Sequence, residues 1–140
     1  MSAQEIKNNI GEDIFNSYFK FCVIRNPYDK MVSLYNMAVK RDGFNKSFSN
    51  FVRRKKCINY FRYFIDGKSC IDFYIRFENL HEDLKKVCKK LNIEYNIDKL
   101  PKFKSEYRED NDYKQYYNEE LKKIVYDKHK KEFELFGYEF

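Results

Sequence analysis

One stretch of the sequence decides the expected fold: Phe19-Lys20-Phe21-Cys22-Val23-Ile24-Arg25-Asn26-Pro27-Tyr28-Asp29-Lys30-Met31-Val32-Ser33-Leu34-Tyr35. Its first six residues are almost all apolar, which is typical of a strand buried within a parallel sheet. Asn26 is a preferred N-cap and Pro27 a preferred first helical residue, so a helix should begin there. Apolar residues then recur at helical spacing, and the helix is expected to run to about Lys40.

A second strand followed by a helix is predicted at residues 71–77 and beyond. Asn79 is expected to cap the amphipathic helix, with Glu82 completing a capping box. At the same junction, Arg76 and Glu78 are expected to form a buried ion pair that braces the end of the sheet. Two strand–helix units indicate an α/β layer architecture with a parallel sheet. Two strands make a small sheet, so further strands either lie in the loops or are missing.

The other segments are expected to be mostly helical. Residues 3–18 contain apolar positions at helical spacing and a break near Gly11, and residues 42–68 look helical but irregular. A polar loop leads to a last helix that begins at about Asn118. Residues 133–140 are rich in aromatic side chains, and we expect this ending to be packed.

Composition narrows the class of protein. The 140 residues include 28 Lys and Arg against 22 Asp and Glu, a net charge of +6, and 43% are hydrophobic. These values exclude collagen-like and mostly disordered chains, and no apolar run is long enough for a transmembrane helix. No signal peptide is evident either, so we expect one cytoplasmic domain over residues 1–140. A basic chain favours an anionic partner, although an AT-rich genome would also enrich lysine.

The cysteines and histidines indicate no metal site. The chain has Cys22, Cys57, Cys70, Cys88, His81 and His129. No C-x-x-C pair and no zinc-ligand spacing occurs among them. We therefore expect reduced, structural thiols, with a disulfide between Cys57 and Cys70 only in an oxidising compartment. Both histidines are expected at the surface or in helix packing rather than in catalysis.

The junction between the first strand and its helix is the strongest candidate for a binding site. A helix N-terminus attracts phosphate through free N–H groups and partial positive charge, and Arg25 adds a cationic fork that suits phosphate oxygens. Ser33 lies eight residues further along the polar stripe of the expected helix. Two alternatives remain open: Arg25 could pair with a local carboxylate, and Ser33 could simply face solvent.

Three blocks of the chain resemble PAPS-dependent sulfotransferases of the carbohydrate type, in the order that the family has them. They are residues 19–35, residues 72–80 with the following helix, and residues 117–138. The resemblance implies a P-loop-nucleotide-kinase-like α/β fold, here with a truncated parallel sheet flanked by helices. It also implies PAPS (3′-phosphoadenosine 5′-phosphosulfate) as the nucleotide cofactor, no metal, and a carbohydrate or other hydroxyl acceptor.

By this resemblance, Arg25 and Ser33 would hold the 3′-phosphate, and Lys104 and Ser105 would complete the nucleotide pocket. The chain also departs from the family, because nothing before Arg25 resembles the loop that binds the 5′-phosphosulfate and no histidine stands where the family has its catalytic base. The chain is therefore expected to be N-terminally truncated, or completed by a second chain, and the catalytic residues stay unassigned.

A basic, non-enzymatic module that binds nucleic acid or polyanionic glycan is the alternative. The cationic run Arg53 to Lys56 lies among aromatic residues, and stacking combined with phosphate contacts binds single strands. None of the sequence signatures of the common RNA-binding folds or zinc fingers supports this alternative.

Overall fold

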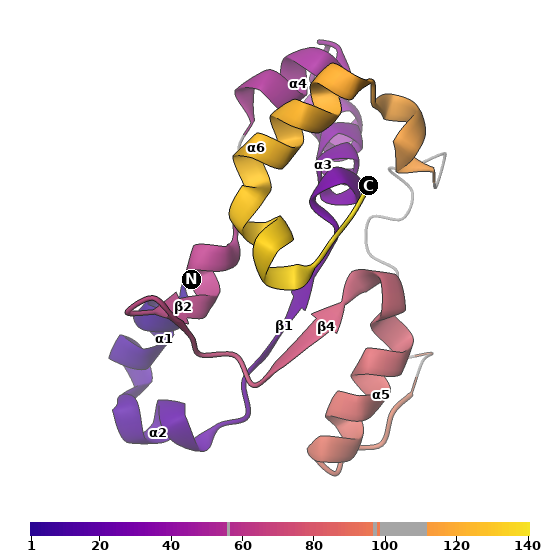
Figure 1. The fold of residues 1–140 in the computed structure, drawn as a ribbon. Coiled ribbons are helices and arrows are strands. Elements are labelled where there is room, and N and C mark those ends of the chain that lie inside the picture. The colour runs from indigo at the N-terminus through magenta and orange to yellow at the C-terminus, as the bar shows by residue number, and fades with distance from the viewer. Residues whose placement is uncertain (56, 97, 99–111) are drawn as a thin grey trace. The chain divides into compact units, whose positions relative to one another are not determined.

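The structure of the chain, a computed structural model, describes residues 1–55, 57–96, 98 and 112–140 (Figure 1). It divides into two compact units, which are considered separately below. Unit 1 comprises Met1–Ile24 and Asn59–Ile97, and unit 2 comprises Arg25–Ile58 and Asp98–Phe140. Each unit is therefore assembled from two segments that are distant in sequence.

Unit 1 contains a small parallel sheet with helices. Its elements are α1 (Ala3–Ile10), α2 (Glu12–Ser17), β1 (Phe21–Ile24), a 3₁₀ turn (Tyr60–Tyr63), β2 (Phe64–Ile65), β3 (Lys68–Ser69), β4 (Phe73–Arg76), a second 3₁₀ turn (Phe77–Asn79) and α5 (Leu80–Lys90). The break between α1 and α2 falls at Gly11, whose φ of 87° is left-handed backbone that favours glycine. The expected break in this helical segment is confirmed.

Strands β1 and β4 pair in parallel, as the two strand–helix patterns predicted (Figure 1). Phe21 lies opposite Phe73, and Ile24 opposite Arg76. The expectation that β1 is buried on both faces is wrong. Phe21 and Val23 are 43% and 45% exposed, because a sheet of two strands, with α5 packed against β4, leaves one face of β1 open.

A short antiparallel hairpin, β2–β3, is the additional strand pair hidden in the middle of the chain. Its turn is Asp66-Gly67, and both residues have positive φ, 49° and 75°. An Asp-Gly pair in this conformation is the usual two-residue hairpin turn. The hairpin forms its own sheet among the described strands and does not extend the parallel one.

The junction between β4 and α5 is built differently from the expectation. Arg76 and Glu78 are both exposed, so they do not form a buried ion pair, and the side chain of Asn79 makes no capping hydrogen bond. The buried carboxylate is Asp83, which accepts hydrogen bonds from the Arg76 backbone N–H (2.9 Å), the Asn79 amide (3.2 Å) and the Lys86 ammonium (2.7 Å). These bonds hold the pKa of Asp83 below its usual value.

Unit 2 is a set of helices with an aromatic core. Its elements are α3 (Pro27–Asp42), α4 (Phe48–Arg54), a 3₁₀ turn (Tyr113–Tyr116) and α6 (Glu119–Phe136). Helix α3 packs against α4, α6 and the 3₁₀ turn. It begins at the predicted residue and runs two residues beyond the predicted end, Lys40. Asn118 caps α6 through its side chain, which accepts from the Leu121 N–H at 2.9 Å.

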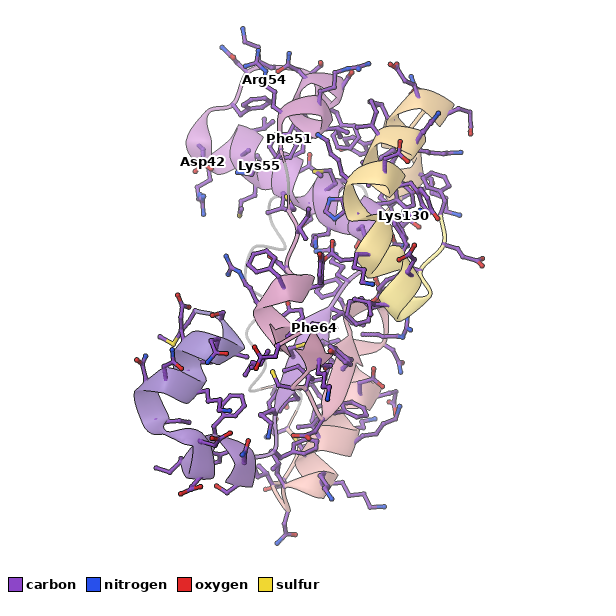
Figure 2. All side chains as sticks on the ribbon, turned by 60° about the vertical axis from the view of Figure 1, so that its left-hand side comes forward. Asp42, Phe51, Arg54, Lys55, Phe64 and Lys130 are labelled. Atoms are coloured by element: carbon purple, nitrogen blue, oxygen red, sulfur yellow. The ribbon has the colours of Figure 1, made fainter. Side chains whose placement is uncertain are left out.

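The core of unit 2 is continuous and crowded with rings. Met31, Val32, Val52 and Val125 have no exposed surface, and aromatic residues surround them. Phe51, labelled in Figure 2, is one of the core residues from α4. The predicted packing of the aromatic ending is confirmed, because the Phe140 ring lies edge-on to the Tyr28 ring at 4.9 Å between centroids.

The described cysteines are free thiols, as expected, in both units. Burial raises the pKa of Cys22 in unit 1 to about 12, and it also raises the pKa of Cys57 in unit 2. In the described part of the chain, no helix combines the length and the apolar character that crossing a membrane requires.

Candidate functional site

The backbone N–H groups at the start of α3 are partly capped by the neighbouring side chains. The Asn26 side-chain oxygen accepts from the Tyr28 backbone N–H at 3.0 Å, and Pro27 has no N–H to offer. The helix end therefore presents fewer free N–H donors than the sequence suggested. Its partial positive charge remains, because that charge comes from the aligned peptide dipoles of a 16-residue helix.

Contacts from the C-terminal segment hold Asn26 in place. Its amide nitrogen donates to the backbone carbonyl of Glu139 at 2.7 Å and to the Tyr113 hydroxyl at 3.4 Å. Asn26 is 8% exposed, so these bonds form in a largely water-free place. The start of α3 is thus fixed by residues more than eighty positions away in the sequence.

Arg25 lies just before this helix and is paired with a carboxylate one turn further on. Its Nε donates to the Asp29 carboxylate, and the two side chains are 19% and 11% exposed. The local pairing that the sequence left open is therefore real. A guanidinium carries five N–H donors in a planar fork, so a bond through Nε fixes the plane of the fork and its direction.

Ser33 lies on α3, one turn beyond Asp29 and two turns beyond Arg25. Residues four apart lie on one side of a helix, so Asp29 and Ser33 share a stripe that begins beside Arg25. Ser33 is half-buried. The structure thus places Arg25 and Ser33 in the same unit, with Arg25 just before α3 and Ser33 on it, whereas Lys104 and Ser105 lie outside the described residues.

A buried charged cluster adjoins this helix and was not predicted. The Lys30 ammonium lies 3.0 Å from one carboxylate oxygen of Glu132 on α6, and the other oxygen is bonded to His129 Nδ1. Burial would raise the pKa of Glu132, but the hydrogen bond with His129 and the charge of Lys30 hold it below its usual value. Lys30 and Glu132 are therefore an ion pair that links α3 to α6.

His129 is a packing residue of α6, which confirms one of the two roles expected for it. It is 1% exposed, and its Nε2 has no hydrogen-bond partner among the described residues. Val125, His129 and Phe133 recur every four residues, and this spacing was the available signal that His129 faces the core. His81 is exposed and contacts the Tyr95 hydroxyl at 2.8 Å.

The residues at the start of α3 fit a phosphate group. Arg25 supplies a fork whose orientation Asp29 fixes, Ser33 supplies a hydroxyl, and the helix supplies partial positive charge. The nearby formal charges come in pairs, Arg25 with Asp29 and Lys30 with Glu132. Recognition of an anion here would therefore depend on directed donors rather than on an excess of positive charge.

The cationic run that motivated the alternative function is partly neutralised. Arg53 pairs with Glu120 at 2.6 Å in an exposed position. Arg54 and Lys55, labelled in Figure 2, are exposed, and Lys56 lies outside the described residues. The described part of this run therefore offers two cations rather than a continuous basic surface.

Comparison with known proteins identifies the class. The sequence profile of the sulfotransferase family matches residues 2–139. The chain is also similar to a protein of Archaeoglobus fulgidus described as uncharacterized, with 36% identity over 105 residues that cover 70% of this chain and 88% of that protein. No solved structure matches. The chain therefore belongs to the sulfotransferase family.

Proposed function

We propose that the chain binds PAPS through its 3′-phosphate at the start of α3 and takes part in sulfuryl transfer to a hydroxyl of a carbohydrate-type acceptor. The observation that carries this proposal is the position of Arg25 just before the capped helix α3, paired with Asp29 of its first turn, with Ser33 one turn beyond Asp29. Membership of the sulfotransferase family supports sulfuryl transfer in general.

Each part of the arrangement has a role in holding the nucleotide. The Arg25 fork would donate to two phosphate oxygens, which suits a doubly charged terminal phosphate better than a phosphodiester. Ser33 would donate its hydroxyl from the next turn. Asp29 would keep Arg25 from rotating away, so less side-chain freedom is lost when the phosphate binds.

PAPS supplies the sulfuryl group. The acceptor hydroxyl oxygen attacks the sulfur, and 3′-phosphoadenosine 5′-phosphate is the leaving group. The proton of that hydroxyl needs a base, and no described residue is assigned to this role. The carbohydrate-type acceptor and the nucleotide-kinase-like fold are inferred from the resemblance of residues 19–35 to carbohydrate sulfotransferases. The parallel pairing of β1 and β4 is compatible with such a fold.

Calorimetric titration with 3′-phosphoadenosine 5′-phosphate tests the site. We expect Arg25→Ala to weaken binding by about tenfold to a hundredfold, as for the loss of a charge-assisted bidentate contact. Arg41→Ala is the matched control, because Arg41 is a cation at the other end of α3, paired with Asp42 on the surface. We expect this control to bind like the wild type.

A second ligand distinguishes recognition of the 3′-phosphate from non-specific attraction of an anionic nucleotide to the basic chain. Adenosine 5′-monophosphate lacks the 3′-phosphate, so Arg25→Ala should leave its affinity unchanged. Equal losses for both nucleotides, or no binding of either by the wild type, would contradict the proposed site. Salt-sensitive binding of single-stranded DNA or heparin that Arg25→Ala does not affect would favour the alternative basic module instead.

The acceptor class needs its own assay. Transfer of labelled sulfate from PAPS should be measured on a panel of glycans and simple alcohols. Transfer confined to glycans would support the carbohydrate-type acceptor, and transfer confined to simple alcohols would contradict it.

A further inference from the structure

Unit 1 contains an apolar pocket that none of the residues of α3 lines. Its volume is about 300 Å³, and its lining includes Ile6, Ile10, Phe15, Phe19, Phe21 and Ile71. Helices α1 and α2 and the residues that lead into β1 and β4 supply these side chains. All the lining residues belong to unit 1, so the pocket is formed within one unit.

The lining leaves apolar groups open to solvent. Ile6 and Ile10 are 38% and 37% exposed although they lie on the lining face of α1. Apolar surface in contact with water has an unfavourable free energy, which a ligand that covers it removes. An apolar ligand that fills this pocket would therefore gain affinity without any rearrangement of charged groups.

Lys20, the single cation of the lining, already has hydrogen-bond and ion-pair partners. The Lys20 ammonium donates to the backbone carbonyls of Tyr18 (2.6 Å) and Phe15 (3.3 Å) and lies 3.4 Å from the Asp72 carboxylate. Asp72 in turn accepts from the Lys20 backbone N–H at 2.7 Å, and this bond holds the pKa of Asp72 below its usual value. Lys20 thus fixes the wall of the pocket and has little to offer an anion.

We propose that this pocket binds an uncharged hydrocarbon group of a small molecule. No charge in the lining awaits a partner, so a charged ligand would lose its hydration without compensation. The volume is at the lower end of the range for small-molecule sites. A protein partner would instead need about 800 Å² of surface on each side, and this hollow offers much less.

N-phenyl-1-naphthylamine, an uncharged fluorophore that brightens in apolar surroundings, is a suitable probe for the full chain. We expect saturable fluorescence enhancement with the wild type. Ile6→Asp places a carboxylate in the lining and should weaken binding of the probe by about tenfold or more, because the charge would lose water when the probe enters. Ala3→Leu fills the pocket without adding a charge and should also weaken binding.

The matched control is Ile14→Asp. Ile14 is 51% exposed on α2 and does not line the pocket, so the control introduces the same charge without entering the site. Far-ultraviolet circular dichroism should show equal helix content in the variants. Equal weakening by Ile14→Asp, or unchanged binding by Ala3→Leu, would overturn the proposal. So would enhancement that appears only where sedimentation detects dimers, because the probe would then bind at an interface between two copies rather than in the pocket.

Discussion

The two units differ in how fully they bury their apolar side chains. Unit 2 gathers them into one core, in which Met31, Val32 and Val125 have no exposed surface. In unit 1, by contrast, side chains such as Phe21 and Phe61 are 43% and 54% exposed. The described part of unit 1 has two sheets of two strands each and three α-helices of six to eleven residues, and such short elements cover little surface.

This difference in burial indicates which unit can hold functional side chains in fixed positions. The candidate phosphate site belongs to the well-packed unit, and the core residue Tyr28 lies in the first turn of α3, two residues after its N-cap Asn26. Directed donors need fixed positions, and packing provides them. The pocket of unit 1 needs only apolar surface, which an open arrangement supplies.

Removal of a core ring in unit 2 should have the largest effect. Phe133→Ala empties a site that is 5% exposed and in contact with the Tyr28 ring, at 5.0 Å between centroids. We expect the free energy of unfolding to fall by about 3–5 kcal/mol. Urea denaturation followed by circular dichroism measures this change. Leu135→Ala is the control on the same helix, because Leu135 is 38% exposed, and a loss as large as that of Phe133→Ala would contradict the contrast.

Loss of the buried carboxylate should rank second. Glu132→Gln leaves Lys30 without its anion and weakens the bond to His129, so we expect a loss of about 2–3 kcal/mol at neutral pH. The folded state lowers the pKa of Glu132, so this stability is present above the pKa of the unfolded chain and is lost as pH falls through the folded value.

The pH dependence follows from the sign of that shift. The difference in unfolding free energy between wild type and Glu132→Gln should shrink as pH falls below 4.5, the ordinary pKa of a glutamate carboxyl, and through the lower folded pKa, because the wild-type carboxyl becomes protonated as well. Urea midpoints at several pH values measure it. A difference that stays constant over this range would show that the charge of Glu132 contributes nothing.

Loss of a lysine that caps α4 should have a smaller effect. The Lys128 ammonium donates to the carbonyls of Val52 (2.5 Å) and Arg53 (2.6 Å) at the end of that helix. Lys128→Met should cost about 1 kcal/mol, because cations stabilise the carbonyl ends of helices. The control is Lys130→Met on the same helix, where Lys130 only approaches Glu134 at 3.9 Å (Figure 2). A comparable cost in the control would remove the capping explanation.

Truncation of an exposed ring in unit 1 should have the smallest effect. Phe61→Ala changes a side chain that is already 54% exposed, so we expect a change within about 0.5 kcal/mol. The affinity for 3′-phosphoadenosine 5′-phosphate should also stay unchanged, because Phe61 belongs to unit 1. Thermal melts and calorimetry measure the two quantities. A large loss of stability would mean that unit 1 depends on this ring as a core residue.

Strong local signals made part of the fold predictable. The apolar run before Asn26 and the Asn-Pro pair placed β1 and the start of α3 correctly. At Asn79 the local signal misled, because its side-chain amide donates to the Asp83 carboxylate instead of capping the helix. The hairpin was missed although Asp66-Gly67 is a strong turn signal, because its strands have only two residues each.

The candidate site could be proposed from the sequence only where its residues are close together in the chain. Arg25 and Ser33 were proposed because both belong to one predicted strand–helix unit. The ion pair of Lys30 with Glu132 joins residues that are 102 positions apart, and no pattern along the chain relates them. Asp29 was visible as a neighbour of Arg25, but only the helix geometry shows that it fixes the guanidinium.

The raised thiol pKa values mean that the reaction of one cysteine in each unit can report on how that unit opens. Disulfide exchange reagents attack the thiolate, and burial keeps Cys22 of unit 1 and Cys57 of unit 2 protonated at neutral pH. Each partly buried thiol should therefore react more slowly than an exposed one, and faster when its own surroundings open. Quantifying the modification of the two cysteines by mass spectrometry over time would then compare the opening rates of the two units in one unmodified sample.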